Sequence, residues 1–267
     1  MGYPNIIFGR YGDEKFTQST TFGILLGGLM ILPDGRTYVH SKASSAAALS
    51  LGCPVVQKDS DTLAGSADNL AVATNAAIGA TTVVITMPAG TTVATVVDQF
   101  AGGYLFATND AGQGYTYKIK SSNSAAAAST ATFILEPTDP IVIALATGTS
   151  DVTVRENQYY DVLDRAAATG SVGAPAGVPQ AAVSAGYYCW LLRRGEGTFL
   201  SAGTVVVQGR PFACATTVAG FQAWHPTPAA GSTEGGTTLS PVAEAWGYCS
   251  VPPSASTEYF AGILTLV

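Results

Sequence analysis

The chain has 267 residues, of which only 11% are charged, against a typical value of about 25%, while 47% are hydrophobic. So little charge favours a component of an assembly, because part of the apolar surface must then be covered by copies of the chain or by another protein. The net charge of −6 and the lack of any run of Lys or Arg argue against DNA or RNA as a partner, because nucleic-acid binding requires many phosphate contacts.

The N-terminal region begins with a polar, Gly-containing stretch and continues with the one long apolar run. Residues 1–21 show weak periodicity, so we expect an extended arm there. The apolar run 22–32 is too short to span a bilayer, which needs about 20 apolar residues. Its length suits a signal peptide, but Asp13 and Glu14 precede it where basic residues belong, and the turn 33–36 follows directly. We interpret 22–32 as a buried strand and expect no membrane partner.

Short runs of β-branched and aromatic residues, bounded by Gly, Pro, Asn or Asp, recur about every dozen residues, which is typical of sandwiches and barrels. The pattern predicts an all-β fold. Two short helices are also expected, at Ser44–Leu51, which is rich in Ala and ends at Gly52, and around Glu156–Arg165. The expected strands cover residues 24–32, 36–40, 81–87, 102–108, 113–120, 131–136, 141–145, 151–155, 185–193, 203–207, 242–249 and 259–266.

Length and loop composition together predict two β modules, although one elaborated sandwich is also possible for a chain of this size. Residues 58–155 would form an inserted module and 156–267 a C-terminal module, each sandwich-like or barrel-like. Residues 22–57 would add strands and a short helix to the C-terminal module. Segments 121–130 and 166–180 consist mostly of Ala, Ser, Gly and Pro, so we expect a hairpin loop and a linker there.

Two of the expected strands indicate which side chains are buried. In 113–120 the aromatic residues share one face and the lysines the other, which indicates a half-exposed sheet rather than a patch for an acidic partner. In 185–193 apolar residues lie on both faces, so we expect an internal strand or an oligomer interface. The two faces of the second strand carry Tyr187, Cys189, Leu191 and Arg193 on one side and Tyr188, Trp190 and Leu192 on the other.

The cysteines offer no metal site. Cys53, Cys189, Cys214 and Cys249 lie too far apart in the sequence for a zinc or CxxC pattern. Each has apolar or small neighbours, where a reduced cysteine packs as a small hydrophobic residue. We therefore favour buried free thiols over disulfides, of which four cysteines allow three pairings.

No motif in the chain supports catalysis or cofactor binding. The two histidines, His40 and His225, are far apart, and no G-x-S-x-G motif presents a nucleophile. The glycine pairs lack the Lys-Ser or helix of a phosphate site. The acids that a glycosidase or a calcium site would need are few, and turn or helix-cap positions are their commoner use. They are Asp59, Asp61, Asp161, Asp164 and Glu234. We expect no enzyme, no metal and no cofactor.

Five blocks, in this order and rough spacing, resemble a family of tailed-bacteriophage head proteins that are encoded with the major capsid protein and are common in phages of aquatic bacteria, including cyanophages. They are Met30–Arg36, Gly114–Ser121, Asn157–Tyr159, Ala185–Trp190 and Ser256–Tyr259, and they span nearly the whole chain. No single block is diagnostic. Cys189, Arg193 and Arg194 depart from the family's pattern. From the family we would expect a less basic end of this strand.

The resemblance implies a capsid decoration, or cement, protein on the outer surface of the head of the virion. Such a protein is β-rich, usually a homotrimer, and binds the major capsid protein, and its N-terminal arm, here residues 1–21, often reaches over the shell or a neighbouring subunit. It implies no catalytic residues. Aromatic side chains are the usual interface anchors, although a core or edge position is commoner for each of those in this chain. The candidates are Tyr159, Tyr160, Tyr187, Tyr188, Trp190 and Trp224.

Two other functions remain open from the sequence. A tail or fibre module that binds host carbohydrate would use Trp224 beside His225 as a stacking platform. An enzyme that degrades surface polysaccharide would need a pair among the five acids named above, and the sequence shows no carboxylate constellation for it.

Overall fold

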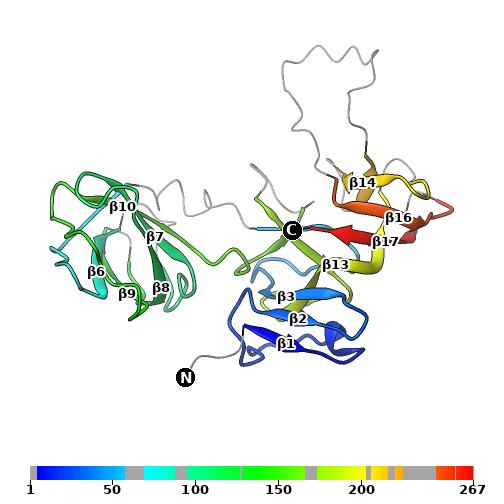
Figure 1. Cartoon of the computed structure of the whole chain (residues 1–267), viewed down its shortest axis with the longest axis horizontal. Coiled ribbons are helices and arrows are strands. Elements are labelled where there is room, and N and C mark those ends of the chain that lie inside the picture. Colours follow the sequence, from blue (N-terminus) through cyan, green and yellow to red (C-terminus); the bar gives the residue numbers. More distant parts are fainter. Residues whose placement is uncertain are drawn as a thin grey trace, which may run out of the picture. The chain divides into compact units, whose positions relative to one another are not determined.

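The computed structural model describes residues 5–57, 69–87, 95–126, 128–165, 173–202, 206–215, 220–224, 245–255 and 257–266. Their regular structure consists of strands β1–β17 and one short 3-10 helix, Asp13–Lys15. The chain divides into two compact units (Figure 1): unit 1 comprises Met1–Lys58 and Tyr159–Val267, and unit 2 is Asp59–Gln158. The predicted all-β fold with two β modules is therefore confirmed. Within the described residues, no helix is long and apolar enough to cross a membrane.

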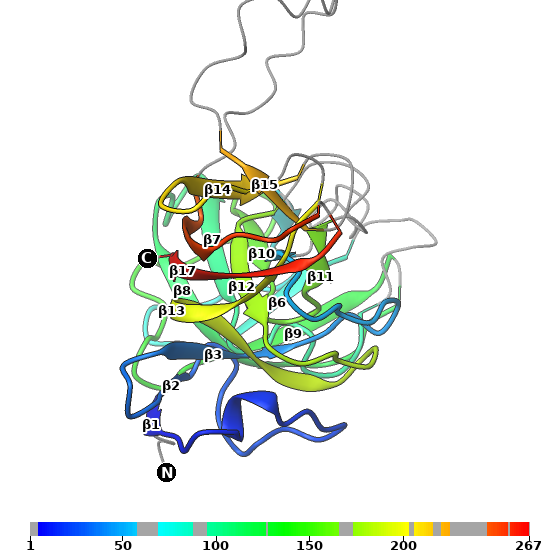
Figure 2. The same cartoon turned by 90° about the vertical axis from the view of Figure 1, so that its right-hand side faces the viewer.

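Unit 1 is built on an eleven-stranded sheet whose main path runs β1-β2-β3-β13-β17-β16-β14-β15 (Figure 2). Beside this path, β12 pairs with β13 and β4, and β4 pairs with β11. The strands are β1 (Ile6–Phe8), β2 (Leu29–Ile31), β3 (Thr37–Lys42), β4 (Val55–Val56), β11 (Leu163–Asp164), β12 (Pro175–Pro179), β13 (Tyr188–Leu200), β14 (Pro211–Cys214), β15 (Phe221–Ala223), β16 (Gly247–Val251) and β17 (Tyr259–Thr265).

Strand β13 organises unit 1 because it is thirteen residues long and pairs with three strands, β3, β12 and β17. Its first half pairs with β3 and its second half with β17. In the first half, Cys189 and Leu191 face one buried cluster while Trp190 and Leu192 face another. The sequence interpretation of residues 185–193 as an internal strand is therefore confirmed, and its two apolar faces reflect two cores in one unit.

The larger core of unit 1 is aromatic. The rings of Phe199, Phe212, Phe221 and Phe260 are fully or almost fully buried, and Phe212 lies 5.0–5.1 Å, centroid to centroid, from the other three. Trp246 closes the cluster with its ring 5.4 Å from that of Phe221. Edge-to-face and tilted packing of this kind adds about 0.5–1.5 kcal/mol per pair to the hydrophobic effect.

Unit 2 is a six-stranded sheet in the order β5-β10-β7-β8-β9-β6. An antiparallel bridge between Val72 and Ile85 joins its first and last strands, so that the sheet nearly closes into a barrel. Alternate residues point inward, as in β6 with the pattern exposed, buried, half-buried, buried, exposed. The strands are β5 (Leu70–Ala71), β6 (Thr82–Thr86), β7 (Tyr104–Asn109), β8 (Thr116–Ser122), β9 (Thr130–Leu135) and β10 (Asp151–Arg155).

The predicted half-exposed sheet at 113–120 is confirmed. Tyr117 and Ile119 are buried in the barrel core, and Lys120 on the other face is exposed. Lys118 is partly covered, since its ammonium group donates to the Gly102 carbonyl and lies 3.9 Å from the centroid of the Tyr104 ring. The lysine face therefore presents one exposed lysine from this strand and does not form a basic patch.

The two predicted helices are wrong. Within 44–51, Leu49 and Val183 exchange backbone hydrogen bonds of 2.9 and 3.0 Å as an antiparallel bridge. Within 156–165, Val162 bridges to Ala43 and β11 follows. Helix propensity is a weak preference, and here tertiary pairing with distant segments overrides it, even in the alanine-rich segment 44–51.

Several expected strand limits also need correction. The strand expected at 24–32 is confined to β2, because Gly27 adopts φ +89° and turns the chain before it. Residues 141–145 form a single bridge, Leu145 to Ala76, instead of a strand. The segment expected as the linker 166–180 contains β12 in its described part. The strands expected at 203–207 and 242–249 lie partly outside the described residues, and β16 continues the second to Val251.

The described part of the expected N-terminal arm, residues 5–21, belongs to unit 1 and packs on its sheet. Strand β1 pairs in parallel with β2, and Gln18 bridges to Tyr188. The side chain of Glu14 is buried, and its carboxylate lies 3.8 Å from the guanidinium of Arg36. This part of the segment is thus an added edge of the sheet.

Candidate protein-contact surface

Five of the six aromatic residues proposed as interface anchors lie around β3. Tyr159 and Tyr187 pack against one core cluster, and Trp190, only 4% exposed, belongs to the other. The Lys42 ammonium lies 4.7 Å from the ring centroid of Tyr160 and 5.6 Å from that of Tyr188. These contacts hold unit 1 together, and the structure does not gather the five into one exposed surface.

The sixth candidate, Trp224, follows β15 at the other end of the sheet. Its side chain is half-buried, and its backbone N–H donates to the Pro211 carbonyl at 3.1 Å. His225, its neighbour in the carbohydrate hypothesis, lies outside the described residues.

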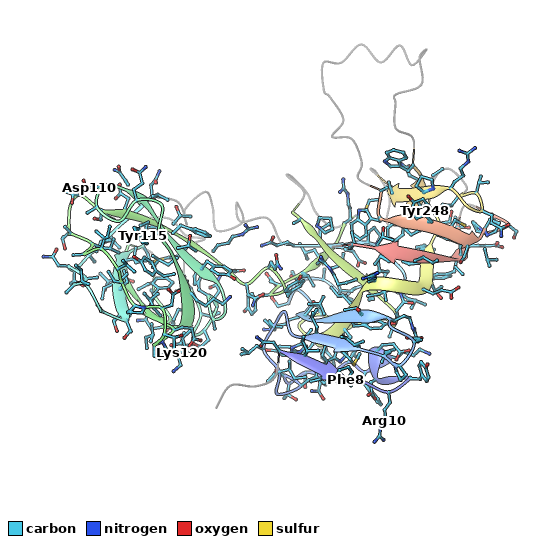
Figure 3. The ribbon with its side chains drawn as sticks, viewed as in Figure 1. Phe8, Arg10, Asp110, Tyr115, Lys120 and Tyr248 are labelled. Atoms are coloured by element: carbon cyan, nitrogen blue, oxygen red, sulfur yellow. The ribbon has the colours of Figure 1, made fainter. Side chains whose placement is uncertain are left out.

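A continuous group of exposed apolar side chains lies on the outer face of β16 and β17, which we call the β16–β17 face. Because successive residues of a strand point to opposite sides, Phe260 and Leu264 enter the aromatic core while their neighbours face outward. Tyr248, labelled in Figure 3, lies on β16, and its partner across the two strands is Ile263. The face consists of Tyr248, Val251, Tyr259 and Ile263, each 46–59% exposed.

The charge distribution around this face suits protein contact. Strands β16 and β17 contain no charged residue. On the adjacent strand β13, Arg194 lies opposite Thr265 and Glu196 opposite Ile263, and both charged side chains are exposed. An apolar, tyrosine-containing centre with a rim of mixed charge is the usual anatomy of a protein interface.

Unit 2 also exposes apolar side chains, but they come from different elements. Tyr104 belongs to β7, Ile134 to β9, and Ile78 and Val142 to loops. Tyr115 lies at the start of the 113–120 segment and stacks on Tyr117 at 6.3 Å. Isolated exposed apolar residues are normal for a folded domain, so the β16–β17 face remains the better candidate.

The two described candidate acids, Asp161 and Asp164, hydrogen-bond to backbone groups of a distant segment of unit 1. An oxygen of Asp161 accepts the Ser45 N–H at 3.3 Å, and one of Asp164 accepts the Ser50 N–H at 2.9 Å. Burial raises the pKa of Asp164, whose side chain is almost fully covered. The other three candidate acids, Asp59, Asp61 and Glu234, lie outside the described residues. Within the described part of the chain, no group of three or more His, Cys, Asp or Glu could hold a metal ion.

All four cysteines are free and buried, so the expectation of buried thiols is confirmed. Burial raises the pKa of Cys53 and of Cys189 to about 12 and also raises the pKa of Cys214 and Cys249. Because the thiolate is the reactive form, we expect Ellman's reagent to label the native protein very slowly at pH 8 and to label four thiols after unfolding in guanidinium without reductant. Fewer than four thiols in the unfolded protein would contradict this assignment.

The one described histidine, His40, lies in an aromatic cluster and is completely buried. Its ring centroid is 5.3 Å from those of Phe22 and Trp190 and 5.5 Å from that of Tyr188. One ring nitrogen lies 3.3 Å from the Leu25 carbonyl, whereas Nε2 has no hydrogen-bond partner. Burial disfavours the charged imidazolium and therefore lowers the pKa of His40.

This lowered pKa predicts that unit 1 becomes less stable in mild acid. The unfolded chain binds a proton at His40 near pH 6.5 and the folded chain only at lower pH, so stability falls as the pH drops below about 6.5 towards the folded pKa. Urea unfolding followed by tryptophan fluorescence at pH 8 and at pH 5 measures the difference. His40→Gln is the control, and its loss of stability between the two pH values should be smaller than that of the wild type. Equal losses would show that His40 is not responsible.

Comparison with known proteins supplies no relative: no protein-family model, no curated protein and no solved structure matches the chain. The fold and the surface define an all-β protein of two units whose most evident feature is an exposed, uncharged sheet face.

Proposed function

We propose that the chain is a structural protein of the virion that decorates and stabilises the outer surface of a tailed-phage head by binding the major capsid protein. The β16–β17 face carries this proposal, because it presents two tyrosines and two aliphatic side chains from strands without any charge. The resemblance of the five sequence blocks to phage head proteins supplies the class of partner.

The physical properties of the chain fit such a role. A subunit that bridges several capsid subunits gains effective concentration with each contact, so many weak contacts add up over a symmetric shell. The face is backed by the aromatic core of unit 1, so its side chains are held on a rigid platform. Rigid apolar anchors lose little entropy on binding. Assembly as a homotrimer on the capsid surface, where the shell holds the copies together, and the absence of catalytic activity are part of this proposal.

The test of this function is cryo-electron microscopy of the virion, combined with binding of purified variants to capsids that lack this protein. We expect density for the chain on the outer shell. Ile263→Glu, which places a charge at the centre of the β16–β17 face, should weaken capsid binding at least about tenfold. The matched control is Ile78→Glu, an exposed aliphatic residue of unit 2. Density at the tail tip, or equal binding by the two variants, would overturn the proposal.

A second candidate function is a tail or fibre module that binds carbohydrate. The partial exposure of Trp224 at the end of β15 favours it, because an accessible indole can stack on a sugar ring. A glycan array with the wild type and Trp224→Ala tests it: hits that disappear in the variant would support carbohydrate binding, and an array without hits would exclude the glycans tested.

A further inference from the structure

The outer edge of β1 is a pairing site held in place by the rest of unit 1. The Asn5 carbonyl accepts the Leu29 N–H at 2.6 Å, and the Gly9 N–H donates to the Ile31 carbonyl at 3.0 Å. Ile7 packs against the aromatic core. Gly9 lies so close to β2 that a Cβ there would approach the sulfur of Met30 to 2.6 Å. The strand is therefore fixed along its inner edge.

The same hydrogen bonds show which backbone groups point outward. In a parallel pair, alternate residues of a strand direct both their N–H and their C=O groups to the neighbouring strand. Asn5 and Gly9 bond to β2, so the residues between them that face away are Ile6 and Phe8. Their side chains share one face of the strand, where Ile6 is 51% and Phe8 is 85% exposed. Figure 3 shows Phe8 and Arg10 at this margin of the sheet.

The opposite end of the main strand path is already paired at one residue. Strand β15 is the last strand, and its outer side receives a hydrogen bond of 2.7 Å from the Ala202 N–H to the Phe221 carbonyl, next to a bridge between Ser201 and Phe221. Along that path, in the described residues, the outer side of β1 is the edge left open (Figure 2). A head-to-tail contact, in which β1 of one copy joins β15 of the next, would have to displace this pairing at Phe221.

We propose that the outer edge of β1 binds β1 of a second copy of this chain in an antiparallel arrangement, so that the two sheets become continuous. A twofold axis at Ile7 places Ile6 opposite Phe8 of the second copy, and Phe8 opposite its Ile6. The outward N–H and C=O groups of both residues then form four hydrogen bonds, because each directly opposed pair exchanges two. On the exposed face the four side chains of Ile6 and Phe8 lie together and cover one another.

The observations favour a second copy because the edge is complementary to itself. A twofold axis maps its two donors and two acceptors onto partners of the same spacing, as a closed dimer requires. Exposed strand edges are usually protected by charged residues, yet β1 contains none and Arg10 lies beyond the strand. The strand is only three residues long, so the dimer should be weak and concentration-dependent, and stronger when two copies are held side by side on a shell.

The first test is sedimentation of the full chain over a range of concentrations. We expect a reversible dimer in the wild type. Phe8→Pro removes an outward N–H and leaves the hydrogen bonds to β2 in place, so it should raise the dissociation constant about tenfold or more while the fold is retained. Ile263→Glu on the β16–β17 face is the control and should dimerise as the wild type does. A wild type that stays monomeric at its highest soluble concentration, or unchanged dimerisation in Phe8→Pro, would overturn the proposal.

The second test reads the register directly. Because the native thiols are buried, new cysteines at the edge are the reactive ones. An equal mixture of Ile6→Cys and Phe8→Cys should give a disulfide-linked dimer on mild oxidation, since directly opposed residues lie about 5.5 Å apart, within the range for a disulfide. Either variant alone should give far less. Cross-linking of Phe8→Cys alone at the level of the mixture, or none in the mixture, would contradict the proposed pairing. Both tests are independent of capsid binding.

Discussion

Replacing Phe212 with alanine is expected to lower the free energy of unfolding of unit 1 by about 3–5 kcal/mol. The ring is completely buried and contacts three other phenylalanine rings. On its remaining side it lies against the main chain, since a Cβ on Gly247 or on Gly262 would come within 2.9 or 3.0 Å of it. Backbone and interlocked rings cannot move in to fill the space, so most of the cavity should persist.

All three tryptophans of the chain, Trp190, Trp224 and Trp246, belong to unit 1, so urea unfolding followed by their fluorescence reports the stability of that unit. Tyr248→Ala is the matched control on the same sheet, because this aromatic ring is half exposed on the opposite face. Tyr248→Ala should lower the free energy of unfolding by less than about 1 kcal/mol, which is the contribution of a cross-strand pair such as that with Ile263. Similar losses in the two variants would show that the aromatic cluster is not the main core of unit 1.

The sequence predicted the fold class and many of the strands because the hydrophobic pattern of a strand is local. The alternation of Tyr117, Lys118, Ile119 and Lys120 is visible in the sequence and is realised in β8. The apolar residues on both faces of 185–193 likewise corresponded to two buried sides. Such patterns depend on which residues a strand contains and not on its partner.

The missed elements depend on distant partners. Strand β4 is two residues long and exists because β11 and β12 pair with it. Leu49 is held by Val183, more than a hundred residues away, so an alanine-rich stretch that suggested a helix is extended. The edge strand β1 has only the sequence Ile-Ile-Phe and a single neighbour. No local pattern distinguishes these segments from loops.

The sequence predicted the strands that carry the candidate surface, but it could not show which face of the sheet their side chains are on. Strand β17 has apolar residues on both of its faces, Tyr259 and Ile263 on one and Phe260 and Leu264 on the other. Only the position of the core shows that Tyr259 and Ile263 face outward. Selecting interface anchors by residue type favoured Tyr187, Tyr188 and Trp190, because core and interface positions prefer the same aromatic residues.

The second large effect is expected in unit 2, where Gly103→Ala should lower stability by about 4 kcal/mol or more. A Cβ at this position would lie 2.0 Å from the Arg155 carbonyl oxygen, far inside van der Waals contact. The glycine cannot move aside easily, because its N–H donates to the Phe100 carbonyl at 2.9 Å and its own carbonyl accepts the Ile119 N–H at 3.0 Å. Relief of the clash must therefore separate β10 from the start of β7, which are neighbouring strands of the barrel.

Hydrogen exchange of the β7 and β10 amides measures this loss, with Gly114→Ala as the control. Gly114 has φ +89°, and a Cβ there would meet no atom within 4 Å, so its substitution adds backbone strain of about 1–2 kcal/mol without a clash. Gly103→Ala should abolish most of the protection in β7 and β10, whereas Gly114→Ala should reduce it modestly. Because unit 2 contains no tryptophan, the fluorescence transition of unit 1 should survive in both variants. If Gly103→Ala removes that transition as well, the folding of unit 1 depends on the barrel inserted into it.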